Sequence, residues 1–471
     1  KAPKMTHGRR SLDARLALAA GGALFLVAGL LPAPSAGQEL DVTEGAARSV
    51  TVDEAVRAAL RNSPDLRQAR AGVREARTQE TGAVGAFLPN LDLSYGFSDA
   101  STGRLDPTSQ AITTTSFDTQ LTGSVQILDG LRRFNQLDNA EKEVTAQRAT
   151  FEQRRYELML ETKRAFFDAV AARERVRVEE DRVERQREQL DFVRQQISLG
   201  QATRADSLSS RVNLNDARLA LLNARNDARA AQFALAEAMG VMRRVAPAEE
   251  AALEPDTLDL DLDRLMTMAE ERAPRVRSAR RSAEAAESSV DSEKSGFAPS
   301  LQLSGGWAWQ NDDFPPKDRS WSFSLRGSLP LFDGFQRETG VAAAEARADA
   351  ADARVRSEVL AVRSEVDDAH SQMETALAGL DVARESVELS RENLRVARQR
   401  YRLGANTILE LQQAQIDLQQ AELDLIQRQF DYQVAVARLE SLLGTELDAG
   451  AGPATGAGSP TPSDSDTGTD S

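Results

Sequence analysis

The sequence predicts a mixed fold class in which amphipathic β-strands are joined to very long α-helices, and every element occurs twice. Three observations predict it. Short motifs recur in the same order at nearly constant spacing, four segments alternate apolar and polar residues, and two helical stretches, 131–198 and 335–402, far exceed an ordinary helix. The chain is 28% charged and only 5% aromatic, a composition typical of long helices and coiled coils.

The first 37 residues have the pattern of a cleavable secretory signal peptide. Arg9 and Arg10 form a basic start, Leu16 to Leu31 form an apolar run, and small residues follow up to Gly37. A retained membrane anchor is the alternative. Because the sequence contains no cysteine, we expect no lipid anchor on the mature protein and no disulfide.

Charge and composition argue against several function classes. Residues 1–37 carry five basic groups and one acid, so their removal takes the net charge from −15 to about −19, which disfavours nucleic acid as a partner. The two histidines are His7, in the predicted signal, and His370, which we expect to be a solvated helix residue. No catalytic, metal or cofactor motif is present, so the sequence predicts a protein that is not an enzyme and needs no cofactor.

An internal duplication organises the chain. Two motifs recur 210 residues later: Asn62–Arg67 matches Arg272–Arg277, and Phe87–Pro89 matches Phe297–Pro299. Three more recur 204 residues later: Leu128–Gly130 matches Phe332–Gly334, Leu199-Gly200 matches Leu403-Gly404, and Gly240 matches Gly444. The sequence therefore predicts two tandem repeats, 38–240 and 263–445. An acidic, irregular linker (241–262) separates them, and a disordered acidic tail (446–471) follows.

Each repeat is predicted to contain the same elements in the same order. A helical run (53–86 and 263–296) precedes a strand hairpin (91–127 and 301–331), a long helix (131–198 and 335–402) and a return helix (203–239 and 407–443). Gly200 and Gly404 are expected to be left-handed and to end the long helices. Thr203 and Thr407 are expected to cap the return helices.

The predicted strands alternate with period two. Leu91, Leu93, Tyr95 and Phe97 share one face, and the other three strands repeat the pattern, separated by loops near 98–114 and 310–320. Each strand has about ten residues, the length that a tilted strand needs to cross a bilayer. Trp307, Trp309 and Trp321 flank the second loop, which suits an aromatic belt at a membrane interface. A tryptophan cluster in a soluble sheet is the alternative.

The second long helix carries a heptad seam typical of a coiled coil. Its large positions are Val359, Val366, Met373, Leu380, Val387, Leu394 and Tyr401, and small residues such as Ala369 and Ala376 lie three places further on. The return helix has large apolar residues at the same spacing of seven from Leu411 to Leu439.

Four strands cannot close a barrel alone, since about eight are needed. An open sheet in lipid would leave unpaired edges. We therefore expect several copies to share one barrel. Two copies would give eight strands, three would give twelve, and four would give sixteen.

Several motifs carry a family resemblance. They are Ser328–Gly334 with Arg337, Tyr401–Thr407 and Leu439–Gly444, with first-half counterparts Ile127–Gly130 with Arg133, Ile197–Thr203 and Leu235–Gly240. Over roughly 50–445 the sequence resembles the TolC-like outer-membrane efflux proteins. The resemblance implies a homotrimer that combines a membrane β-barrel of twelve strands with a long α-helical coiled-coil barrel in the periplasm. It also implies a periplasmic adaptor and an inner-membrane pump or secretion ATPase as partners, and outer-membrane lipid around the barrel.

The resemblance also implies site residues. Acidic residues after the second turn ring the tunnel mouth in the family and select cations. Glu410 matches the first of these positions, while Gln413 and Asn406 replace the family's second acid and its basic residue; Asp206 is the first-half counterpart. Glu410 could instead be an ordinary solvated carboxylate at a helix N-terminus.

Two further groups of site residues complete the prediction. The tip turns that an adaptor would contact comprise Leu199, Gly200, Thr203, Leu403, Gly404 and Thr407. The strand–helix junctions comprise Pro89, Pro299, Pro330, Asp129, Gly130, Asp333 and Gly334. The alternative function is a non-channel coiled-coil scaffold or adaptor of the cell envelope. No sequence feature identifies a drug, metal or protein cargo.

Overall fold

The computed structural model describes residues 48–105, 112–249, 253, 260–311 and 314–447. The predicted signal peptide (1–37), residues 250–252 and 254–259 of the linker, and the tail from residue 448 lie outside these residues. The described chain contains eight α-helices, a two-stranded and a four-stranded sheet. Within this part, no helix is long and apolar enough to cross a membrane.

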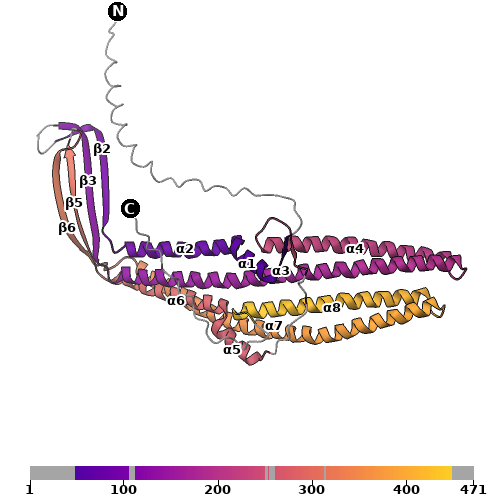
Figure 1. Ribbon diagram of the computed structural model, residues 1–471. Coiled ribbons are helices and arrows are strands. Elements are labelled where there is room, and N and C mark those ends of the chain that lie inside the picture. Colours follow the sequence, from indigo (N-terminus) through magenta and orange to yellow (C-terminus); the bar gives the residue numbers. More distant parts are fainter. Residues whose placement is uncertain (1–47, 106–111, 250–252, 254–259, 312–313, 448–471) are drawn as a thin grey trace, which may run out of the picture. The chain divides into compact units, whose positions relative to one another are not determined.

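Four helices form two antiparallel pairs (Figure 1). The first pair is α3 (Arg132–Ser198) and α4 (Arg204–Ala238), and the second is α7 (Gln336–Arg402) and α8 (Ile408–Leu443). Contacts between α3 and α8 join the pairs, so the order across the row is α4, α3, α8, α7. The predicted heptad seam is the buried contact between α7 and α8, with Val366, Met373, Leu380 and Leu394 inside.

Each predicted helical run of about 34 residues is broken in two, which corrects the single helix expected from the sequence. The first run is α1 (Val52–Asn62) and α2 (Pro64–Gly85), and the second is α5 (Leu262–Arg272) and α6 (Pro274–Lys294). The breaks fall at Ser63 and Ala273, whose ψ angles are 128°. The proline that follows each residue disfavours the helical conformation for it and begins the next helix instead.

The larger sheet is antiparallel throughout, in the order β2 (Asn90–Leu105), β3 (Ile112–Leu128), β5 (Ser300–Asn311) and β6 (Asp318–Ser328). The pairing of β3 with β5 joins the two halves of the chain. In the first hairpin, the segments predicted as loop at 98–105 and 112–114 are strand, so these strands have 16 and 17 residues rather than about ten. In the second, β6 ends at Ser328, short of the predicted 331. Pro330 has no N–H to donate to a ladder.

A small parallel sheet lies beside the helices and was not predicted. β1 (Arg48–Val50) pairs with β4 (Val245–Pro247), which falls in the segment expected to be irregular. Val50 and Val245 are buried in a cluster with Phe166, Val170 and Leu235. Three residues are too few for a recognisable alternation, so only packing reveals this sheet.

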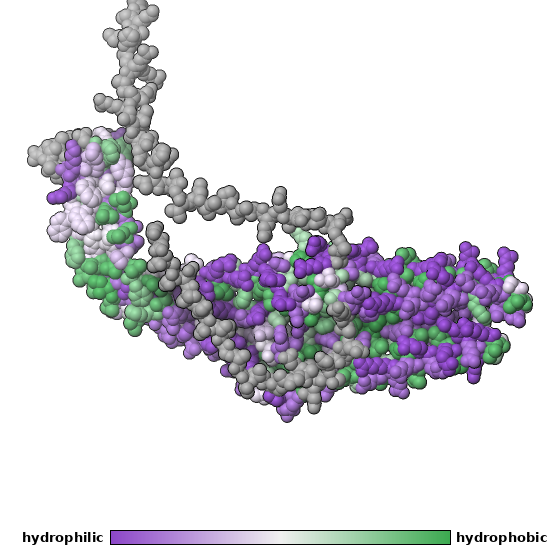
Figure 2. All heavy atoms as spheres, viewed as in Figure 1, coloured by the Kyte–Doolittle hydropathy of each residue, from purple (hydrophilic) through white to green (hydrophobic). Residues whose placement is uncertain are grey.

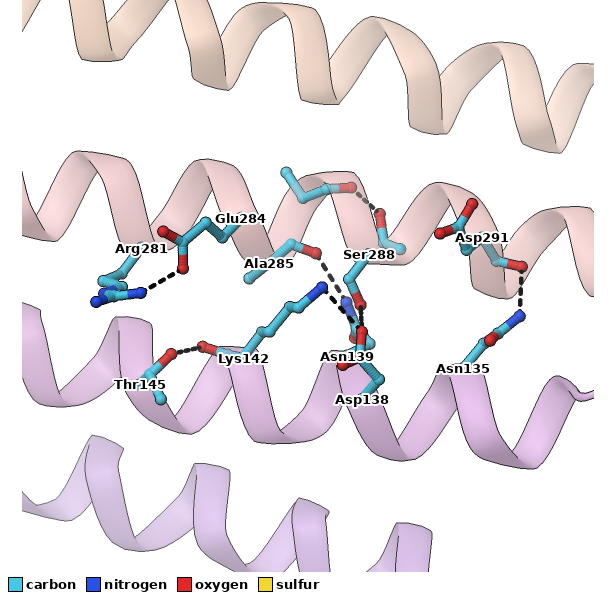
Figure 3. A network of polar contacts seen from close by, with 12 residues as sticks. Asn135, Asp138, Asn139, Lys142, Thr145, Arg281, Glu284, Ala285, Ser288 and Asp291 are labelled. Carbon is cyan, nitrogen blue, oxygen red and sulfur yellow. Dashed lines mark hydrogen bonds and ion pairs between the residues drawn. The ribbon is translucent and has the colours of Figure 1, made fainter.

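Polar side chains join α3 to α6 near the sheet (Figure 3). Asn135 donates to the Asp291 carbonyl at 3.0 Å, and Asn139 donates to the Ala285 carbonyl at 2.8 Å. The Ser288 hydroxyl donates to Asp138 at 3.0 Å. Because α3 and α6 belong to different halves of the sequence, these contacts fix one half on the other.

His370 differs from its expected solvated state. The residue is 7% exposed, and its Nε2 lies 3.0 Å from the Leu260 carbonyl oxygen. The segment that precedes α5 covers it, and a helical periodicity argument cannot foresee a covering loop. The residue therefore has a structural role at the base of α5.

Candidate functional site

The turns that join the long and return helices have the predicted local geometry. Gly200 and Gly404 have φ of 73° and 71°, a conformation that glycine adopts without strain. Leu199 and Leu403, which precede them, are 67% and 76% exposed. Figure 1 shows both turns at the same end of the helices. The two exposed leucines and the two glycines therefore form the tips of the helix pairs.

Capping boxes start both return helices and involve the two candidate acids. Thr203 caps α4, and its N–H donates to the Asp206 carboxylate at 2.8 Å. Thr407 caps α8, and its N–H donates to the Glu410 carboxylate at 3.3 Å. In return, the N–H groups of Asp206 and Glu410 donate to the threonine hydroxyls. Both acids therefore hold a helix terminus, whatever else they do.

A row of carboxylates continues from Glu410 along α8. Asp417, Asp424 and Asp431 follow at intervals of seven residues, and Gln413, Gln420 and Gln427 donate to them at 2.7, 3.0 and 2.7 Å. Gln413 is thus exposed and orients Asp417, while Asn406 is half-buried at the turn. This row was not predicted, although its residues follow Glu410 in the sequence at intervals of seven.

Aromatic contacts tie the two tips together. The rings of Phe192 and Tyr401 lie 5.8 Å apart, near the ends of α3 and α7. The Arg402 guanidinium lies over Phe192 at 5.9 Å. Burial raises the pKa of Tyr401, and the negative charge of Asp206 adds to the shift. The tips of both pairs are therefore level and in contact.

Above the tips, a buried polar band separates α3 from α8. Gln186 donates to Gln415 at 2.9 Å, with both side chains buried. Glu422 lies between Arg185 at 3.7 Å and Arg391 at 3.6 Å. Burial raises the pKa of Glu422, and the charges of the two arginines oppose that shift. The heptad pattern of one helix does not show which polar residues of two helices face each other, so this band could not be predicted from it.

The predicted strand–helix junctions hold the same contacts twice. Arg133 donates to Asp129 at 2.8 Å, and its guanidinium lies 5.0 Å from the Phe87 ring. Arg337 donates to Asp333 at 2.7 Å and lies 4.9 Å from the Phe297 ring. These residues turn the chain from strand into helix. The matching prolines Pro89 and Pro299 lie between the preceding helices and β2 and β5.

Left-handed backbone makes both junction turns tight. Gly130 and Gly334 have φ of 64° and 72°, and the residues that follow them, Leu131 and Phe335, have φ of 68° and 66°. Added at Gly130, a Cβ would overlap the Cβ of Ala298, whereas at Gly334 it would meet open space. Bulky residues in this conformation are uncommon, so the sequence contained no signal for Leu131 and Phe335.

Apolar side chains gather where the sheet meets the helices (Figure 2). Leu131, Phe134, Leu331, Phe332 and Phe335 are 57–86% exposed. Farther along the sheet, Trp307 and Trp321 are cross-strand partners, 57% and 76% exposed, and Trp309 lies opposite Arg319. Trp307 also pairs with Leu121, near the middle of β3. Among the described residues, no group of three or more histidines, aspartates or glutamates is placed to hold a metal ion.

Comparison with solved structures identifies the fold. The chain superposes on CusC with a TM-score of 0.73 and 20% identity, over 87% of this chain and 96% of CusC. It superposes on the open state of the Neisseria gonorrhoeae MtrE outer membrane channel with a TM-score of 0.72 and 18% identity, over 86% and 94% of the two chains. The architecture is therefore that of outer membrane channel proteins.

Sequence comparison identifies the family. The family model of the outer membrane efflux proteins matches residues 55–241 and 265–445, so the chain belongs to this family. It is 29% identical over 308 residues to Protein CyaE of Bordetella pertussis, and 27% identical over 199 residues to the outer membrane efflux protein BepC of Brucella suis. These alignments span 62% and 42% of the two relatives, less than two thirds of either.

Proposed function

We propose that the chain is one protomer of a trimeric outer-membrane channel that serves as a passive exit duct for efflux or secretion. Its helices form a tunnel in the periplasm. A periplasmic adaptor joins it to an inner-membrane pump or a secretion ATPase, which supplies the energy. Family membership supports this assignment, and the name of BepC favours efflux.

The open sheet is the observation that carries the proposal. β2 and β6 are the edge strands of four, and all eleven residues of β6 are exposed. A bilayer does not tolerate unpaired strand edges, so β6 of one protomer must pair with β2 of the next. Two copies would supply eight strands, which side chains fill. Three copies supply twelve, which leaves room for a lumen.

The helix tips are the proposed entrance. In a ring of three copies, Glu410 and the aspartates that follow it on α8 place repeated negative charges around one axis. Such a ring attracts cations and repels anions. Asp206 and the turn residues of α3 and α4 form the outer part of the same end, where an adaptor would bind.

Conductance in a planar bilayer tests the channel function. The detergent-extracted full chain should insert and give discrete conductance steps that favour cations. Fractionation is the companion measurement, since a channel stays in the outer membrane after high-salt or urea washes. A protein that washes off and gives no conductance would support the scaffold alternative and contradict the proposal.

A further inference from the structure

An apolar groove and an exposed arginine share one face of β5 and β6. We propose that this face binds a phosphorylated lipid of the outer leaflet, with the lipid phosphate on Arg319 and one acyl chain in the groove beside Trp307 and Trp321. The proposal rests on the proposed channel, in which this sheet crosses the outer membrane and the helix tips lie in the periplasm.

Two glycines form the floor of the groove. Gly123 of β3 and Gly305 of β5 are register partners, and both lie on the face that carries Trp307 and Phe323. Since glycine has no side chain, the apolar surface is recessed at this level. The groove has a volume of about 680 Å³, within the range of roughly 300–1,000 Å³ that is typical of small-ligand sites. Around the glycines it is lined by Val125, Leu303, Trp307, Trp321 and Phe323, and by serines that alternate with these residues.

Arg319 is the charged residue on the apolar face of β5 and β6. It lies two residues before Trp321 and pairs with Trp309 across the strands. It is exposed and forms no ion pair with a described residue. Lys317 is exposed nearby and adds positive charge, whereas Asp318 belongs to the opposite, polar face.

A phosphate is the partner that this position fits. A charged side chain on a lipid-facing surface is costly unless it reaches water or an opposite charge. The guanidinium group can bind two phosphate oxygens at once with charge-assisted hydrogen bonds. The positive charge next to an apolar groove is therefore complementary to a lipid that carries a phosphate above its acyl chains.

The spacing along β6 places Arg319 at the depth of the headgroups. It lies nine residues before Ser328, the end of β6 that leads to α7, which is about 31 Å of strand at about 3.4 Å per residue. A strand tilt of about 35–45° turns this length into roughly 22–25 Å across the membrane, close to an apolar band of about 25 Å. Phe323, beside the groove, lies about 14 Å along the strand from Arg319. An acyl chain can span that distance from a phosphate bound at Arg319.

Native mass spectrometry of the detergent-extracted full chain tests the site. The probe is diphosphoryl lipid A, and the wild type should bind one molecule per protomer in preference to the same lipid without its phosphates. Arg319→Gln should weaken this binding by about tenfold, because charge-assisted hydrogen bonds to the phosphate are lost. Arg326→Gln is the matched control and should leave the binding unchanged, since Arg326 is exposed on the polar face of the same strand.

Filling the floor of the groove tests the place of the acyl chain. Gly305→Val should weaken the binding of diphosphoryl lipid A several-fold. Gly327→Val is the control, because Gly327 lies on the same face of β6 but does not line the groove. An added Cβ would lie 3.4 Å from its nearest neighbour at Gly305 and 3.7 Å at Gly327, and valine suits a strand. Both variants should therefore stay trimeric.

The outcomes separate this proposal from the proposed function. Equal binding of the lipid without phosphates, or equal losses in Arg319→Gln and Arg326→Gln, would show lipid contact without a phosphate site. Complete displacement of the lipid by an equimolar amount of inorganic phosphate would show that the site takes free phosphate. Each of these results contradicts the lipid site and leaves the channel intact. A wild-type protein that is monomeric in the same spectra contradicts the trimer on which the proposal rests.

Discussion

Glu410 lies at the N-terminus of α8, where it forms the helix cap and has a proposed electrostatic role. Its carboxylate accepts the Thr407 N–H, and its own N–H donates to the Thr407 hydroxyl. Glutamine serves the same position of a capping box without a charge. Substitution at this residue can therefore separate the cap from the charge.

Glu410→Gln should reduce the preference of the channel for cations while leaving the thermal stability nearly unchanged. Glu410→Ala should reduce both, with a loss of stability of about 1 kcal/mol from the cap. Ion selectivity from reversal potentials and melting followed by circular dichroism are the two measurements. If Glu410→Gln conducts with wild-type selectivity, Glu410 is a capping residue and not part of a selectivity ring.

Gly130 and Gly334 offer a matched pair of substitutions. Both are left-handed, so alanine at either position costs on the order of 1 kcal/mol. Only at Gly130 would the new Cβ overlap Ala298. Gly130→Ala should therefore destabilise the protein by about 1–3 kcal/mol more than Gly334→Ala. Equal melting temperatures for the two variants would show that the junction relaxes freely around Ala298.

Sequence reasoning at this scale succeeded where a residue type has one strong conformational preference. The left-handed glycines at 200 and 404 and the threonine caps at 203 and 407 are confirmed. It did not anticipate Leu131 and Phe335, because bulky residues are uncommon in the left-handed conformation that both adopt. The proposed gating role of Glu410 and the lipid contacts of Trp307, Trp309 and Trp321 stay predictions.

Among the elements, the contact of α3 with α8 is the one that a coiled-coil pattern would not suggest, because polar side chains are buried in it. Glu422 is held there with Arg185 and Asp181 on α3 and Arg391 on α7. A buried carboxyl whose pKa is raised binds its proton more tightly in the folded state than in the unfolded state. Its protonation therefore favours folding.

This linkage gives a pH dependence with a defined sign. The stabilisation from protonated Glu422 is fully present below the ordinary glutamate pKa of 4.5 and is lost as the pH rises through the raised value. Lowering the pH from 7 toward 5 should raise the melting temperature of the wild type relative to Glu422→Gln, by on the order of 2 °C. A difference that is constant with pH, or of opposite sign, would contradict the raised pKa.

The long elements followed from the sequence and the short or interrupted ones did not. The heptad pattern located α7 and α8 closely, and the internal duplication located α3 and α4. The breaks before Pro64 and Pro274 were missed, although the residue before a proline avoids the helical region. The strand residues beyond 97 were not readable, because their Ser, Gly, Asp and Thr content is typical of a loop. They are strand because Ser98 and Asp99 pair with Ser116 and Thr115.

For the whole molecule, the described residues leave the two edges of the larger sheet open, those of β2 and β6. Each edge can pair with the other edge on a second copy. Heterologous contacts of this kind generate a ring when the rotation closes. The proposed trimer would pair both edges, which the four strands of a single chain cannot do.

The native mass of the protein extracted in mild detergent tests this account most directly. Corrected for bound detergent, it should equal three times the mass of one mature chain, and the complex should persist on dilution. That result would support the twelve-stranded barrel shared by three protomers. A stable monomer, or a dimer held only by its helices, would leave β2 and β6 unpaired in lipid and would contradict the channel.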